Sequence, residues 1–169
     1  MNFLNKHYIK HLSTDALFER VAPYINLMEW GQYQPEQQAV LLDAVREPLV
    51  TLADITDATT YFFGTDVTIP NDLQQAVLGE SSARMVLEQF LSEWPQWDKT
   101  NPDALRADLK AMMKALKPLK PKQVMFPIRT ATTGRTSGAD LATALWLLGT
   151  QRVQHRVEQA LAYCPVATA

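Results

Sequence analysis

Apolar residues recur at helical spacing along almost the whole chain, and prolines and glycines interrupt them at short intervals. Leu105, Leu109 and Met112, for example, lie three or four residues apart, which places them on one face of a helix. One β-prone segment, residues 65–69, is short, and we expect it to be a connector. The periodicity therefore predicts an all-α array of roughly nine or ten short helices.

Capping residues predict where several of these helices begin. Ser13 and Asn101 carry the short polar side chains that accept hydrogen bonds from the first free amides of a helix. Thr51 and Asp54 have the spacing of a capping box, which predicts a helix over residues 51–62.

The clearest interruption of the helical pattern is the segment Pro95–Thr100. With 169 residues, of which 47% are hydrophobic, the chain is long enough for one domain or two small ones. We therefore expect two consecutive helical subdomains, residues 1–97 and residues 98–169.

Several classes of protein are excluded by what the sequence lacks. The single cysteine, Cys164, has no partner for a disulfide, which fits a reducing compartment. No window reaches the roughly 20 consecutive apolar residues that span a bilayer. The polar N-terminal residues do not form a signal peptide. We expect a soluble, cytoplasmic and monomeric protein.

The usual motifs of catalysis and cofactor binding are also missing. Glycine-rich nucleotide loops, HExxH and CxxC do not occur. His7, His11 and His155 have no cysteine or carboxylate partners at metal-ligand spacing, and no histidine close in sequence activates Cys164. We therefore expect no catalytic residue, no metal site and no cofactor in this chain.

The net charge of −2 conceals a strong asymmetry along the chain. Residues 1–105 contain six basic and fifteen acidic residues, whereas residues 106–156 contain ten basic and two acidic ones. Lys110, Lys114 and Lys117 lie at helical spacing on one side of a predicted helix. Such a face is either a solvated surface or a nucleic-acid contact, and the shortage of acidic partners favours nucleic acid.

The most distinctive run is residues 124–141, VMFPIRTATTGRTSGADL, followed by LLG at residues 147–149 and by two arginines on the last predicted helix. This run closely resembles the C-terminal anticodon-binding region of bacterial-type glutamyl-tRNA synthetases. There the chain reads like FxPLRxALTGRTxGPDL, followed by LLG and an arginine-containing helix. The opening NFLN is similar to the NWLN at which that region begins, and the resemblance extends from Asn2 to Leu161.

The resemblance implies an all-α domain of two subdomains, attached to a class I enzyme that joins glutamate to tRNA with ATP and magnesium. This chain lacks the HIGH-type and KMSKS-type signatures of that enzyme's nucleotide-binding domain, so we do not expect it to activate glutamate. We expect the tRNA-reading domain of a longer synthetase, with tRNA-Glu as partner. A free-standing relative of that domain is the alternative.

The family pattern also implies roles for individual residues. Arg129 matches an arginine that approaches the anticodon bases, although it could instead bond a helix end. Gly134 and Gly138 would let backbone amides approach a base or phosphate, or would simply stop and start helices. Gly138 and Leu141 match positions beside the first anticodon bases, although Leu141 could be a core residue. The expected RNA-binding residues, including those for phosphate contact, are Arg129, Thr133, Gly134, Arg135, Thr136, Gly138, Leu141, Arg152, Arg156, Lys110, Lys114 and Lys117.

In some members of this family, an arginine in the first subdomain helps to reject the glutamine anticodon. The corresponding helix here is residues 36–47, and its single arginine, Arg46, falls later than that position. We therefore hypothesise that discrimination at the third anticodon base is relaxed, so that both tRNA-Glu and tRNA-Gln are accepted.

Two other classes of function are alternatives. The acidic first half could be the docking face of a helical protein-interaction module that binds no RNA. An enzyme of another type is disfavoured, because the sequence contains no acid–base or nucleophile constellation.

Overall fold

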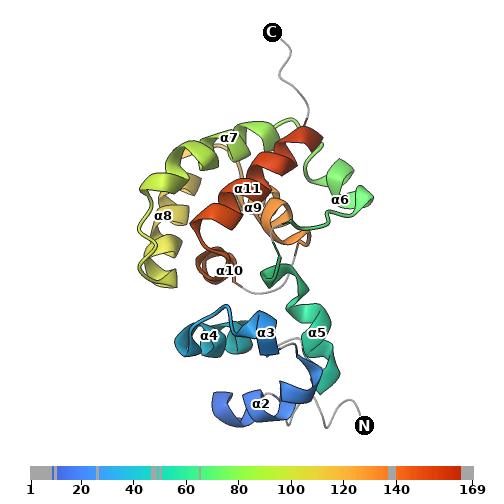
Figure 1. The fold of residues 1–169 in the computed structure, drawn as a ribbon. Helices are drawn as coiled ribbons and strands as arrows, with labels where there is room; N and C mark the ends of the chain where they lie inside the picture. Colours follow the sequence, from blue (N-terminus) through green and yellow to red (C-terminus); the bar gives the residue numbers. More distant parts are fainter. Residues whose placement is uncertain are drawn as a thin grey trace. The chain divides into compact units, whose positions relative to one another are not determined.

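The computed structural model describes residues 9, 11–25, 27–46, 49, 51–64, 66–136 and 140–164. These residues form α-helices and short 3₁₀ turns, and no strand occurs among them (Figure 1). The predicted all-α class is therefore confirmed. The chain divides into two compact units, the first made of residues 1–63 and 138–140 and the second of residues 64–137 and 141–169.

The described part of the first unit contains α2 (Thr14–Val21), α3 (Leu27–Trp30), α4 (Pro35–Arg46) and α5 (Ile55–Ala58), with 3₁₀ turns at Ala22–Tyr24, Leu52–Asp54 and Thr60–Phe62. Ser13 caps α2 as predicted, because its hydroxyl accepts a hydrogen bond of 3.2 Å from the Ala16 amide. α2 packs on α4, and Leu17 and Leu41 are completely buried. The amphipathic faces of these two helices therefore form the core of this unit.

The helix predicted over residues 51–62 is broken into α5 and the two 3₁₀ turns that flank it. The predicted capping box is present, and the Thr51 amide donates to the Asp54 carboxylate at 2.9 Å. Further on, the hydroxyls of Thr59 and Thr60 donate to backbone carbonyls one turn earlier, at 2.7 and 2.8 Å. Such side-chain bonds compete with regular helix geometry, which explains why apolar spacing alone predicted too long a helix.

The second unit contains α6 (Asn71–Ala76), α7 (Ala83–Glu93), α8 (Pro102–Ala115), α9 (Pro121–Thr133), α10 (Leu141–Leu148) and α11 (Thr150–Ala160), with 3₁₀ turns at Trp94–Gln96 and Leu161–Tyr163. α9 packs against α7 and α11, and α8 packs on α10 (Figure 1). Asn101 caps α8 as predicted, because its side-chain oxygen accepts from the Ala104 amide at 2.9 Å.

The division between the units follows Phe63 and does not fall at residue 97, where we expected it. The rings of Phe90 and Trp94 stack at 5.3 Å, and Trp97 meets Phe90 edge-on at 5.3 Å. The Trp94 indole also donates to the Thr150 carbonyl at 3.1 Å. Because these aromatic side chains bury together, the proline-containing segment is a turn within one core.

Candidate nucleic-acid interface

The centre of the distinctive sequence run lies at the carboxyl end of α9, where a tight turn follows the helix. Gly134 has a left-handed φ of 72°, and its amide donates to the Thr130 carbonyl at 2.8 Å. The Thr133 hydroxyl donates to the Arg129 carbonyl at 2.7 Å and accepts from the Arg135 amide at 3.1 Å. The backbone of both arginines is therefore fixed by one threonine side chain.

Of the two roles predicted for Gly134, the structure supports the helix stop, because Gly134 is the left-handed C-cap of α9. It is buried, and a Cβ atom at this position would lie 2.3 Å from the carbonyl oxygen of Thr68. Its amide is already bonded within α9, so a base or phosphate has no access to it. Glycine is needed at this position because the backbone of Thr68 approaches closely. This packing excludes the predicted contact between RNA and the Gly134 amide.

Arg156 is also placed differently from our prediction. Only 1% of its surface is exposed, and its guanidinium donates to the Thr132 carbonyl at 2.7 Å and to the Gly64 carbonyl at 3.0 Å. A phosphate cannot reach a group enclosed in this way. The prediction that Arg156 contacts a phosphate is therefore wrong. Its side chain has a structural role at the end of α9.

The other residues predicted around the turn differ in exposure. Thr133 and Leu141 are buried, with 3% and 0% of their surfaces exposed, so they shape the second unit from inside. Gly138 lies outside the described residues. Four of the predicted residues are half-buried, so part of each side chain is accessible from outside. They are Arg129, Arg135, Thr136 and Arg152.

The predicted lysine row surrounds a hollow of about 290 Å³ at the carboxyl end of α8. All three lysines are exposed. No acidic residue from the described part of the chain lines the hollow, whose residues are Lys110, Met113, Lys114, Lys117, Leu119 and Pro121. The helical spacing predicted the lysines but not the apolar side of the hollow, because Met113 has the spacing of the core stripe of the same helix.

The two acidic residues of α8 already have partners outside this hollow. Asp103 forms an ion pair with Arg106, one turn along the helix. Asp108 accepts a hydrogen bond of 2.9 Å from the Asp98 amide. The surface at the lysine row is therefore strongly positive, and it can attract a polyanion.

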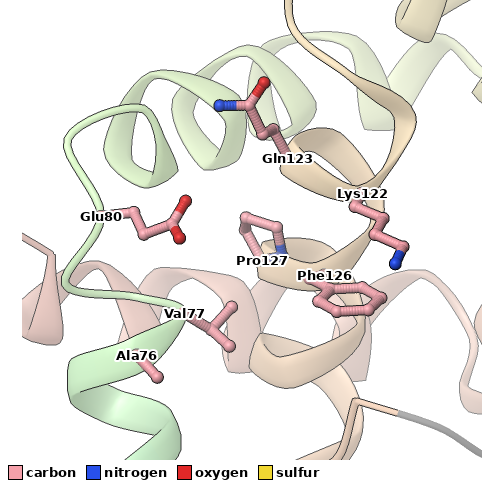
Figure 2. Close-up of a pocket in the computed structure, with 7 residues that line it drawn as sticks. All are labelled: Ala76, Val77, Glu80, Lys122, Gln123, Phe126 and Pro127. Atoms are coloured by element: carbon pink, nitrogen blue, oxygen red, sulfur yellow. The ribbon is translucent and has the colours of Figure 1, made fainter.

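A second hollow, of about 200 Å³, lies between the end of α6 and the first half of α9 (Figure 2). Its lining residues are Ala76, Val77, Glu80, Lys122, Gln123, Phe126 and Pro127. Phe126 and Pro127 belong to the distinctive sequence run, and Figure 2 shows both on the wall of this hollow. The first half of the run thus contributes two residues to this hollow and several to the core, whereas residues 133–136 form the turn at Gly134.

Residues 16–161 match a family model described as an anticodon binding domain. The chain belongs to this family. The glutamate–tRNA ligase of Geobacillus stearothermophilus is 32% identical over 166 residues, which are 95% of this chain and 34% of that protein. The glutamate–tRNA ligase of Halalkalibacterium halodurans is 31% identical over 164 residues, 94% of this chain and 33% of that protein. The chain therefore spans about a third of the length of these relatives.

Solved structures show that the fold of this anticodon-binding domain recurs. A glutamate tRNA ligase from Elizabethkingia meningosepticum matches with a TM-score of 0.81 at 16% identity, over 95% of this chain and 31% of that one. The glutamate-tRNA synthetase from Elizabethkingia anophelis matches with a TM-score of 0.71 at 17% identity, with the same coverage of 95% and 31%. Among the described residues, no helix is long and apolar enough to cross a membrane.

Proposed function

We propose that this chain is the anticodon-binding part of a glutamate–tRNA ligase and that its partner is tRNA-Glu. The observation that carries the proposal is the family match over residues 16–161. Identities of about 30% to glutamate–tRNA ligases support the choice of amino acid. The step that needs ATP and magnesium would belong to the parts of such an enzyme that this chain does not match.

Arg129 near the end of α9 and Arg135 in the turn that follows suit the recognition of unpaired bases. A guanidinium can stack on a base or fork onto its edge, and Arg129 and Arg135 flank the turn with part of each side chain exposed. Thr136 follows Arg135 in the chain, and its hydroxyl can form a hydrogen bond with the RNA. Lys110, Lys114, Lys117 and Arg152 would attract phosphates, which position the RNA without reading its sequence.

We also propose that tRNA-Gln is accepted, because α4 offers no arginine for rejecting it. Arg46 is the single arginine of α4, and 14% of its side chain is exposed. Its guanidinium bonds the Asp43 carboxylate at 2.8 Å and the Ile9 carbonyl at 2.8 Å. These bonds keep Arg46 within its own unit.

Binding of fluorescently labelled tRNA-Glu tests the main proposal. We expect Arg129→Ala, or a changed anticodon in the tRNA, to weaken binding about tenfold. We also expect affinity to fall as salt rises. Arg84→Ala is the matched control, because Arg84 is engaged with Glu88 at 3.0 Å and with the Leu161 carbonyl at 3.1 Å. Binding that is insensitive to both anticodon and salt would favour the protein-interaction alternative.

A direct comparison of tRNA-Glu and tRNA-Gln tests the relaxed specificity. We expect their dissociation constants to agree within about threefold. A preference for tRNA-Glu of more than about tenfold would contradict the proposal. Sedimentation of the same samples tests whether the protein binds tRNA as a monomer.

A further inference from the structure

Arg156 is the one charged residue that is fully buried in the described part of the chain. A guanidinium loses favourable contacts with water on burial, so its N–H groups must find acceptors inside the protein. The acceptors of Arg156 therefore show which parts of the fold depend on it.

One acceptor of Arg156 lies at the end of α9. Nη1 is 2.7 Å from the carbonyl oxygen of Thr132, in the last turn of that helix. The last carbonyls of a helix have no helical N–H partner, and the helix dipole is negative there. A cation at this point satisfies an acceptor and stabilises the helix end.

A second acceptor of Arg156 lies in the segment that leads to α6. This segment consists of Gly64 and residues 66–70 and is called the connector below. Nη2 is 3.0 Å from the carbonyl oxygen of Gly64. Asp66 lies 2.6 Å from the Nε2 atom of His155 on α11, and the Thr68 carbonyl lies against Gly134. The connector is thus held at three successive points against α11 and the turn after α9.

From Thr132, covalent and hydrogen bonds continue to the two arginines proposed to bind bases. The next residue, Thr133, bonds the Arg129 carbonyl at 2.7 Å and the Arg135 amide at 3.1 Å through its hydroxyl. A shift of the Thr132 carbonyl would therefore displace the backbone of both arginines.

We propose that Arg156 is a positioning residue for anticodon recognition. It fixes the carboxyl end of α9 against the connector, so that Arg129 and Arg135 keep the geometry that binds unpaired bases. This inference rests on the proposed function, in which those two arginines touch RNA and the buried Arg156 does not. Arg156 therefore controls discrimination between anticodons and contributes nothing to phosphate attraction.

The first experiment compares Arg156→Met with Arg152→Met. The methionine removes the charge and the hydrogen bonds to the Thr132 and Gly64 carbonyls, and it keeps an unbranched side chain. Arg152 is the matched control, because it lies one turn earlier on α11, is half-buried and donates to the Leu148 carbonyl at 2.9 Å. Dissociation constants are measured for tRNA-Glu and for the same tRNA with a changed anticodon, over a range of salt concentrations.

For Arg156→Met we expect the ratio of the two dissociation constants to fall about tenfold, with an unchanged salt dependence. For Arg152→Met we expect an unchanged ratio and a salt slope that is smaller by about 0.7, the contribution of one single-strand phosphate contact. A folded Arg156→Met protein that keeps the wild-type ratio, or loses salt slope, would overturn the inference.

A second variant decides the matter if Arg156→Met does not fold. Asp66→Ala removes the exposed contact with His155 and leaves the buried guanidinium of Arg156 in place. Asp72→Ala is its control, because it removes an equal charge from an exposed position of α6. We expect Asp66→Ala, but not Asp72→Ala, to lower the ratio about threefold and to speed amide exchange at residues 133–136. Wild-type behaviour of Asp66→Ala in both measurements would overturn the inference.

The two proposals fail in different ways. If the wild-type protein does not distinguish tRNA-Glu from the same tRNA with a changed anticodon, the proposed function fails, and the role of Arg156 in recognition fails with it. If the wild type distinguishes them and the folded variants do so equally well, the inference about Arg156 fails alone.

Discussion

The carbonyl oxygen of Thr68 lies so close to Gly134 that a Cβ atom there would come within 2.3 Å of it. The left-handed φ of 72° independently disfavours any other residue at this position. We predict that Gly134→Ala lowers the free energy of unfolding by about 2–4 kcal/mol, since backbone strain and steric overlap act together. Urea unfolding followed by circular dichroism measures this loss.

Gly64→Ala is the control for that substitution. Gly64 has a φ of 80°, but the nearest atom to a Cβ there would be the Asp66 carbonyl oxygen at 4.0 Å. We expect Gly64→Ala to cost only the backbone strain, about 1–2 kcal/mol. Equal losses in the two variants would show that the contact with Thr68 is unimportant.

Thr130 and Thr132 lie two residues apart on α9, and their buried hydroxyls differ in their partners. The Thr132 hydroxyl donates to the Ile128 carbonyl at 2.8 Å, whereas that of Thr130 has no hydrogen-bond partner in the described part of the chain. We predict that Thr130→Val raises the free energy of unfolding by about 1 kcal/mol and that Thr132→Val lowers it by about 1 kcal/mol. Thermal unfolding of the two variants measures both effects, and a destabilised Thr130→Val protein would contradict the first.

Asn101 and Ser82 precede two helices of the second unit, and only Asn101 forms a side-chain cap. We predict that Asn101→Ala destabilises the protein by about 1 kcal/mol, because the Ala104 amide loses its acceptor. Faster amide exchange at Ala104 should accompany the loss. Ser82→Ala should leave the stability nearly unchanged, and a comparable loss there would argue against capping as the cause.

Cys164 is buried, and its thiol contacts the Ala160 carbonyl at 3.8 Å. Burial raises the pKa of the Cys164 thiol, and the nearby Arg84 opposes this only in part. A raised pKa means less thiolate at a given pH, so we predict that iodoacetamide reacts with the folded protein more slowly than with free cysteine at pH 8. Unfolding in urea should restore the rate. Equal rates in the folded and unfolded protein would contradict the prediction.

Local features of the fold were predictable because their physical causes lie within a few residues. Ser13 and Asn101 cap the helices that follow them, and the capping box of Thr51 and Asp54 forms as expected. The break after α5 was missed because the hydroxyls of Thr59 and Thr60 bond the backbone, which apolar spacing does not reveal.

The division of the chain could not be predicted from its prolines. Pro95 interrupts the helical pattern clearly, yet Trp94 and Trp97 on either side of it bury against Phe90 in one core. A proline marks only the end of a helix. Whether a turn or a boundary follows depends on which side chains pack across it.

The sequence by itself determined the all-α class, the helix starts at Ser13 and Asn101, and the charge asymmetry. Tertiary structure decided which residues of the distinctive run are accessible. Arg156 bonds a carbonyl 92 residues away in sequence, and Gly134 lies against the backbone of Thr68. Helix propensity and capping act through neighbours along the chain, whereas burial depends on segments that meet only after folding.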